Sequence, residues 1–297
     1  MTKDKHKILA IAHRVCPALA KTAVGFATKE EMVQATTRSL AASLASFDGA
    51  VRLFVILDGC PSYRAFFTEV FASADNVQIS FEDTPSIGNQ ETYVKQFEIL
   101  LEEKDADYLY FSEDDYIYQS NAFAAMAEFL DHESVDFVTP LDHPDRYKGI
   151  VPQSAKVEIR LSAHCHWREV GSTCCTFMTK KSTFHKAKRL LAAYGLGSND
   201  GALWIGLTKD RIFSPKHTLC AAFRFLTGRR KTPEGLEFTT LAAWRWHKWR
   251  LPFGHRYRLW GPIPSLAVHL CKPSLPPFWE KIVAGALQHN PTTIEQC

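Results

Sequence analysis

The first 140 residues alternate short apolar runs with segments whose apolar residues recur at helical spacing. Apolar runs that end in turn residues are typical of buried strands, and spacings of three or four residues indicate helices. Strands that alternate with helices form a mostly parallel sheet with helices packed on it. The expected strands are 7–12, 51–57, 77–81, 107–111 and 135–140, and the expected helices are 28–46, 92–103 and 121–130. The chain is therefore predicted to have an α/β fold.

The second half of the chain has a less regular pattern. Residues 174–179 are predicted to form a strand and 182–193 a helix, and Asn199 is placed to cap a helix that starts at Asp200. Beyond residue 223 the chain becomes basic and aromatic and then Pro-rich, which favours loops wrapped around the core. We expect one continuous domain with halves 1–140 and 141–297.

Composition narrows the class of protein further. A chain of 297 residues that is 46% hydrophobic can bury a large core, which excludes a disordered protein and a small disulfide scaffold. No apolar stretch approaches the roughly 18 residues that a membrane span needs, and the early run 8–12 is too short for a signal peptide. The eight cysteines have no C-x-x-C spacing, so we expect reduced thiols and a cytoplasmic location.

An acidic cluster follows the expected strand 107–111. Glu113, Asp114 and Asp115 come at the carboxyl end of this strand, and open α/β sheets bind ligands beyond such strand ends. Adjacent carboxylates repel one another, and a divalent cation that also holds a substrate phosphate would offset the repulsion. The alternative is a solvated acidic turn.

A second acidic residue, Asp58, follows the expected strand 51–57. In a parallel sheet this side chain would lie at the same edge as the acidic cluster, where a carboxylate can accept hydrogen bonds from a base or a ribose. The alternative is a turn in which Asp58 bonds to nearby backbone, the common reason for Asp-Gly.

The order of these residues resembles the GT-A class of nucleotide-sugar-dependent glycosyltransferases, in a family 2-like form. Glu113-Asp114-Asp115 matches the EDD variant of the acidic DXD motif of that class. The resemblance extends over most of the chain and implies a Rossmann-type sheet followed by an irregular acceptor-side region. Further segments that carry it are Arg14, Asp58, 87–101, 141–147, 167–177, Asn199-Asp200 and 264–269.

The resemblance implies roles for individual residues and for both halves of the chain. Residues 1–140 would bind a nucleoside-diphosphate sugar, with a UDP-sugar favoured, and residues 141–297 would bind the acceptor. Mn²⁺ or Mg²⁺ would be the cofactor, although His269 could instead be an ordinary half-buried histidine. The metal ligands would be Asp115 and His269, and the residues near the nucleotide would be Arg14, Asp58, Lys95, Glu113 and Asp114.

Asp200 is the expected catalytic base. Inverting transfer to a hydroxyl needs one carboxylate to accept the proton of the acceptor and needs no nucleophile. A helix N-terminus is expected to lower the pKa of Asp200 and keep it ionised. The alternative is an ordinary residue in the first turn of a helix.

Three residues are expected to line the acceptor pocket: Trp167, Arg168 and Ser172. Tryptophan stacks on sugar faces, and arginine and serine side chains bond to hydroxyls. The alternative for this segment is a strand with core aromatic residues.

Residues 221–260 form a basic aromatic segment with nine Lys or Arg and two Glu, on a chain with a net charge of +3. Interleaved cations and tryptophans suit an anionic membrane surface or a lipid-pyrophosphate acceptor. No RNA-binding motif accompanies them, so we do not expect a nucleic acid partner. Peripheral binding to the inner face of the cell membrane is expected, and the alternative is a packed loop whose arginines reach into solvent.

The sequence thus predicts a metal-dependent, inverting glycosyltransferase that modifies a hydroxyl of a glycan or glycolipid in surface polysaccharide synthesis. One alternative is a sugar-nucleotide pyrophosphorylase, although residues 12–16 lack the glycines of the loop that such enzymes carry after the first strand. Another is a non-catalytic membrane-docking protein with a glycosyltransferase-like fold, against which the carboxylates of Asp115 and Asp200 argue.

Overall fold

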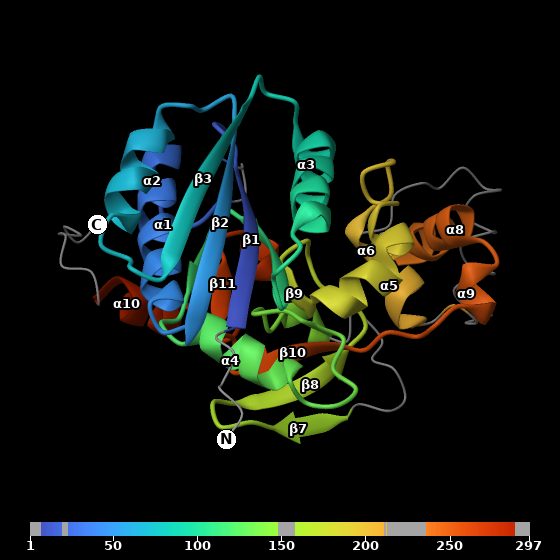
Figure 1. Cartoon of the computed structure of the whole chain (residues 1–297). Coiled ribbons are helices and arrows are strands. Elements are labelled where there is room, and N and C mark those ends of the chain that lie inside the picture. Colours follow the sequence, from blue (N-terminus) through green and yellow to red (C-terminus); the bar gives the residue numbers. More distant parts are fainter. Residues whose placement is uncertain (1–6, 20–22, 148–157, 211, 213–235, 289–297) are drawn as a thin grey trace.

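The computed structural model describes residues 7–19, 23–147, 158–210, 212 and 236–288 (Figure 1). Within these residues one sheet contains nine strands in the order β3-β2-β1-β4-β9-β6-β10-β8-β7. All of them except β8 and β9 run in the same direction. The predicted α/β fold with a mostly parallel sheet is confirmed.

The parallel part of the sheet is built from the first half of the chain. It comprises β3 (Val77–Thr84), β2 (Gly49–Asp58), β1 (Lys7–Val15) and β4 (Tyr108–Glu113). Successive residues of a strand point to opposite faces, so Leu9 and Ile11 pack in one core cluster while Ala10 and Ala12 pack in the other. Burial on both faces explains why these strands read as nearly continuous apolar runs.

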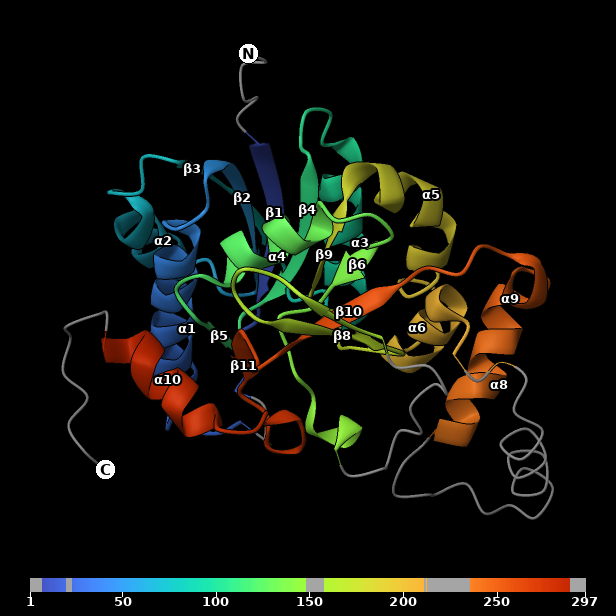
Figure 2. The same ribbon diagram turned by 90° about the horizontal axis from the view of Figure 1, so that it is seen from below.

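Helices cover both faces of this sheet (Figures 1 and 2). The first helix begins with a capping box, in which the Thr28 hydroxyl accepts from the backbone of Glu31 and the Glu31 carboxylate accepts from the backbone of Thr28. None of the described helices has the length and apolarity that crossing a membrane requires. One core cluster contains residues of α1 (Lys29–Leu44), α2 (Tyr63–Phe71) and α4 (Ala122–Leu130), and the other contains residues of α3 (Asn89–Glu102), α5 (Lys181–Leu191) and α6 (Asp200–Thr208).

The antiparallel strand β9 (Phe177–Lys180) joins the two halves of the sheet. Phe177 lies opposite Phe111 of β4, so the residues just before β9 lie beside the carboxyl end of β4. This pairing brings residues 174–176 to the acidic cluster. The strands beyond β9 are β6 (Phe137–Val138), β10 (Leu259–Ile263), β8 (His166–Val170) and β7 (Ile159–Leu161).

The prediction of loops for the C-terminal region was wrong. Proline favours loops, yet Pro262 lies inside β10, opposite Trp167 of β8. The strand β11 (Ala267–His269) pairs with the short β5 (Tyr116–Tyr118) in a separate two-stranded sheet. Helices α8 (Leu236–His247), α9 (Arg250–Phe253) and α10 (Trp279–Gln288) and the 3₁₀ turns Pro144–Arg146 and Lys272–Ser274 complete the described elements.

Helix α8 is held closely against α6. The buried His247 ring donates from Nε2 to the Ala202 carbonyl over 3.2 Å. A Cβ atom at Gly206 would lie 2.5 Å from that ring, so the glycine permits the close approach. The contact fixes α8 on the helix that begins with Asp200.

Candidate functional site

A cavity of about 290 Å³ lies at the carboxyl ends of β1, β2 and β4. Its position is the edge at which open α/β sheets bind ligands. Every residue that lines it comes from the first half of the chain. The lining residues are Arg14, Val15, Cys16, Asp58, Gly88, Asn89, Thr92, Glu113, Asp114 and Asp115.

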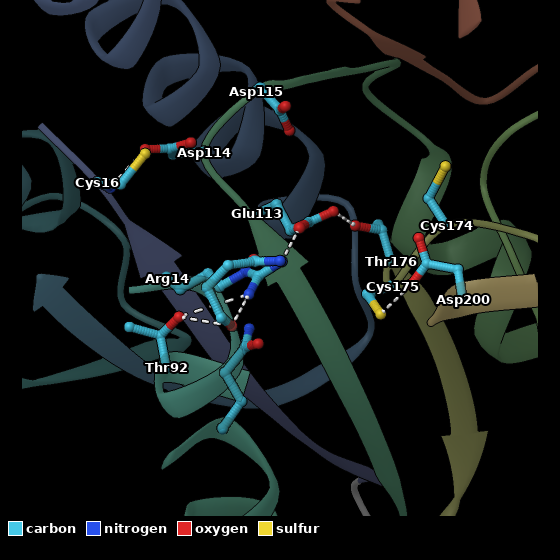
Figure 3. Close-up of polar contacts among 12 residues, drawn as sticks. Arg14, Cys16, Thr92, Glu113, Asp114, Asp115, Cys174, Cys175, Thr176 and Asp200 are labelled. Carbon is cyan, nitrogen blue, oxygen red and sulfur yellow. Dashed lines mark hydrogen bonds and ion pairs between the residues drawn. The ribbon is translucent and has the colours of Figure 1, made fainter. Parts of the chain in front are cut away.

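Arg14 and Glu113 form an ion pair in the middle of the site (Figure 3). Arg14 is the penultimate residue of β1 rather than a residue after it, and its Nη1 also donates to the Asn89 carbonyl over 2.8 Å. The other carboxylate oxygen of Glu113 accepts from Thr176 Oγ1 over 3.2 Å. Burial disfavours charge on Arg14, but its acidic neighbours, Glu113 first among them, together outweigh burial and raise the pKa of the guanidinium.

Asp114 binds a lysine that the sequence analysis missed. Lys29, the first residue of α1, places Nζ 2.6 Å from Asp114 Oδ2, and the backbone N–H of Cys16 donates to the same oxygen over 2.8 Å. Burial raises the pKa of Asp114 to about 6, although Lys29 opposes the rise. Because Lys29 lies far from the acidic cluster in sequence, no spacing could reveal the contact.

Asp115 meets His269, as the resemblance implied. The distance from His269 Nε2 to Asp115 Oδ2 is 3.0 Å, and the His269 ring stacks on Tyr116 with a centroid distance of 4.6 Å. Pairing of β11 with β5 places the two residues together. Burial opposes both charges, yet their attraction prevails, so the pKa of Asp115 is lowered and the pKa of His269 is raised.

Asp115 and His269 fit a divalent cation as part of its donor set. Asp115 Oδ1 is buried without a hydrogen-bond partner in the described part of the chain, so it has a lone pair free to accept a cation or a water. A carboxylate and an imidazole are both ligands of transition metals. The described residues contain no group of three His, Cys, Asp or Glu that could hold a metal, so further ligands would come from substrate and water.

Asp200 lies on the other side of Glu113 from Asp114 (Figure 3). Asn199 caps the helix as predicted, with its side chain accepting from the Ala202 N–H over 2.8 Å. The predicted lowering of the Asp200 pKa was wrong. Burial of the carboxyl outweighs the helix N-terminus, and nearby Glu113 adds to the rise, so the pKa of Asp200 is raised.

Cys175 is a second residue that the sequence analysis missed. Its Sγ–H donates to Asp200 Oδ1 over 2.8 Å. The neighbouring Cys174 lies instead beside the Asp115–His269 pair, with its Sγ 3.9 Å from His269 Nδ1. The sequence analysis predicted only that both are reduced thiols, and the pairing of β9 with β4 brings them to the carboxylates.

Replacing Cys175 with Ala is expected to move the titration of Asp200 to higher pH. The thiol donates to the ionised carboxylate and lowers its pKa, whereas burial raises it. Without the thiol, less opposes the effect of burial, so the pKa of Asp200 rises further. The measurement is a ¹³C NMR titration of labelled aspartate carboxyls, with the Asp200 signal assigned from its loss in Asp200→Asn.

Cys175→Ser is the matched variant, because its hydroxyl also donates to Asp200. In Cys175→Ser the titration midpoint of Asp200 should lie closer to that of the unmodified protein than it does in Cys175→Ala. An unchanged midpoint in Cys175→Ala would mean that the thiol does not affect the charge of Asp200.

Asp58 lines the cavity but uses its carboxylate to hold the loop before α3. Its Oδ1 accepts from Thr84 Oγ1 over 2.7 Å and from the Ile87 N–H over 2.6 Å, and its Oδ2 accepts from the Gly88 N–H over 2.9 Å. Gly88 precedes α3 with a φ of 90°, a conformation that favours glycine. Asp58 therefore bonds to the distant loop before α3 rather than to its own Asp-Gly turn, and its contact with a nucleotide stays a prediction.

Four other predicted residues do not line the cavity. Lys95 pairs with Glu82 over 2.8 Å, and both side chains are exposed. Trp167 is fully buried and stacks on Phe129 with a centroid distance of 4.5 Å, which agrees with the core alternative. Arg168 forms an ion pair with Asp142. The Ser172 carbonyl accepts a hydrogen bond from Arg146.

Comparison with known proteins gives matches by structure alone. No protein-family model matches the chain, and no curated protein matches its sequence. S. aureus TarS 1-349 in complex with UDP-GlcNAc is 14% identical, with a TM-score of 0.41 over 64% of this chain and 53% of that one. The match therefore spans about half the length of that TarS chain.

Two further solved structures are similar to a comparable degree. Mannosyltransferase PcManGT from Pyrobaculum calidifontis, in complex with GDP-Man and Mn²⁺, is 10% identical with a TM-score of 0.42, over 84% of this chain and 73% of its own. The 4-diphosphocytidyl-2C-methyl-D-erythritol synthase from Anaerococcus prevotii is 12% identical with a TM-score of 0.35, over 67% of this chain and 81% of its own.

Proposed function

We propose that the protein is a metal-dependent glycosyltransferase of the GT-A class. It would transfer a sugar with inversion from a nucleoside diphosphate, with UDP favoured, to a hydroxyl of a glycan or glycolipid. The observation that carries the proposal is the position of Glu113: it borders the nucleotide-sized cavity and contacts Thr176, and its charge acts on the buried carboxyl of Asp200. Surface polysaccharide synthesis is the setting that we propose.

The cavity supplies groups that suit a nucleoside diphosphate. Its volume is close to the lower end of small-molecule sites, which suits the nucleotide part of a donor whose sugar lies outside it. Gly88, Asn89 and Thr92 bring the N-terminal turn of α3 to the cavity, and helix N-termini favour anions. Arg14 adds a fixed positive charge on the same side.

Asp115 and His269 would hold the cation at the opposite end of the acidic cluster. A bound cation would supply positive charge that stabilises the departing diphosphate. Asp114 would keep its contact with Lys29, which fixes the turn through which Asp115 reaches His269.

Asp200 would take the proton of the acceptor hydroxyl. Burial raises its pKa, which strengthens the ionised carboxylate as a base. The thiol of Cys175 orients one carboxylate oxygen.

A non-catalytic protein of the same fold is the second candidate. All three carboxylates of the acidic cluster already have a cation from this chain, namely Arg14, Lys29 and His269. Such internal neutralisation would stabilise the fold without a metal or a donor. Nucleotide binding without turnover of any donor would favour this candidate.

Calorimetric titration with UDP, GDP, CDP and dTDP, each in Mn²⁺ and in EDTA, tests the proposal. We expect one nucleotide, UDP in the first instance, to bind in Mn²⁺ and to lose at least about tenfold in affinity in EDTA, since a metal–phosphate contact is worth several kcal/mol. Asp115→Ala should lose binding to the same extent.

Asp83→Ala is the matched control, because Asp83 pairs with Arg64 at the exposed edge strand β3. Its nucleotide affinity should equal that of the unmodified protein. A metal-dependent donor site would be rejected if none of the four nucleotides binds. It would also be rejected if the affinity is the same in Mn²⁺ and in EDTA and is unchanged in Asp115→Ala.

A further inference from the structure

Two aromatic side chains, one just before α9 and one at its end, are exposed to solvent. Trp249 is 77% exposed and Phe253 is 82% exposed. They lie four residues apart, and their rings stack with a centroid distance of 6.4 Å and an interplanar angle of 28°. Stacking joins them into one apolar patch in solvent.

Cationic residues flank these two rings in the sequence. Arg245, Lys248 and Arg250 are all exposed, and none forms an ion pair with a carboxylate whose side chain the structure describes. Arg256 lies close by in sequence, but its charge is paired with Glu169 over 2.7 Å. The docking tip is defined here as Arg245, Lys248, Trp249, Arg250 and Phe253.

The docking tip is fixed to the body of the protein. His247 is buried against α6, and Leu251 packs in a small core with Ala202 and Ile205 of the same helix. Lys209 Nζ donates to the Arg250 carbonyl over 2.6 Å. These contacts engage the inner sides of α8 and α9, so the two aromatic rings cannot turn inward without breaking them.

We propose that the docking tip binds the surface of an anionic phospholipid bilayer. Aromatic rings enter the headgroup layer, and arginine and lysine attract anionic lipid phosphates. The two rings stack on each other rather than lying apart to accept nucleotide bases between them, which favours a lipid surface over single-stranded nucleic acid.

The position of the tip relates the bilayer to the candidate site. Helix α8 packs on α6, which begins with Asp200, and both helices lie on the same side of the molecule in Figure 2. If the proposed function holds, a lipid-linked acceptor would approach from this side. Binding to the bilayer does not itself depend on that function.

Flotation with vesicles tests the proposal. The protein, without nucleotide or metal, is mixed with vesicles of phosphatidylcholine alone or of phosphatidylcholine with phosphatidylglycerol. We expect at least about tenfold more binding to the anionic vesicles, decreasing with salt. Trp249→Ala with Phe253→Ala, and separately Lys248→Glu with Arg250→Glu, should each lose most of it.

Phe278→Ala is the matched control. Phe278 is 68% exposed and lies under the ammonium of Lys281, but it precedes α10 rather than belonging to the tip. Its binding should be unchanged. Equal binding to neutral and anionic vesicles, equal loss in Phe278→Ala, or binding of a single-stranded oligonucleotide without vesicle binding would overturn the proposal.

Quenching by brominated lipid gives a readout that does not depend on truncating the tip. Tryptophan fluorescence should be quenched on anionic vesicles, and the quenching should fall in Trp249→Phe, which keeps an aromatic ring. Undiminished quenching in that variant would show that another surface enters the bilayer. Because neither assay involves sugar transfer, loss of the glycosyltransferase proposal would leave this result standing.

Discussion

Replacing Asp200 with Asn is expected to lower kcat about 100- to 10,000-fold, the usual contribution of a general base. The amide keeps the size of the carboxyl and still accepts a hydrogen bond from Cys175, so the fold should persist. Nucleotide affinity should change little, because Asp200 does not line the cavity. Steady-state turnover of the donor that calorimetry identifies gives kcat, and titration of the nucleotide gives the affinity.

The pH profile supplies an independent check on Asp200. A base must be ionised to accept a proton, so kcat/KM should fall as the pH drops through the Asp200 pKa. Burial raises that pKa, so the acid limb should lie at higher pH than an exposed aspartate would give. Asp83→Asn at an exposed position should retain full turnover. Turnover of Asp200→Asn within a few-fold of the unmodified protein would remove this carboxyl from the mechanism.

Replacing Arg14 with Ala is expected to lower the free energy of unfolding by about 3–5 kcal/mol, the cost of leaving one member of a buried ion pair alone. The side chains of Arg14 and Glu113 are only 11% and 18% exposed, so solvent screens them little. The change would also remove the positive charge that lies near both Glu113 and Asp200, so the two carboxylates would repel each other more strongly. Urea denaturation measures the loss.

Two variants test whether the cost arises from the unpaired charge. In Arg14→Met with Glu113→Gln both charges are removed, so the double variant should be more stable than Arg14→Ala. Arg64→Ala breaks the pair with Asp83, whose side chains are 43% and 47% exposed, and should cost less than about 1 kcal/mol. Equal losses for Arg14→Ala and Arg64→Ala would contradict the assignment of a buried pair.

The parallel half of the fold could be predicted because its signals are local. Strands β1, β2 and β4 are buried on both faces, so each appears as an apolar run, and Thr28 and Glu31 mark the start of α1. Helix α2, Tyr63–Phe71, was not predicted; it has only nine residues and directly follows the turn residues after β2.

The second half could not be predicted to the same extent because its strands are short and are set by pairing with distant residues. Strand β6 has two residues instead of the expected six, and β10 contains a proline. In the sequence, neither a two-residue apolar run nor a segment that contains proline can be told apart from a loop. The basic aromatic segment was predicted as a loop, and the part of it that the structure describes forms α8, α9 and β10, while residues 221–235 lie outside the described residues.

The candidate site was predictable where strand ends carry acidic residues. Glu113 ends β4 and Asp114 and Asp115 follow it, and the family resemblance alone supplied His269 as the neighbour of Asp115. Lys29 and Cys175 reach the site through tertiary packing, which leaves no trace in local spacing. The roles of all these residues and the division of the chain at residue 140 remain predictions.

The order of the site residues along the chain also matters for synthesis. Residues Arg14 to Asp115, which line the cavity, leave the ribosome before Asp200 and His269 are made. Domains tend to form from the N-terminal end as the chain emerges. A nascent chain would therefore assemble the cavity first, and the proposed base and the proposed second metal ligand would be added only with α6 and β11. If the proposed function holds, an incomplete chain would retain a nucleotide without consuming it.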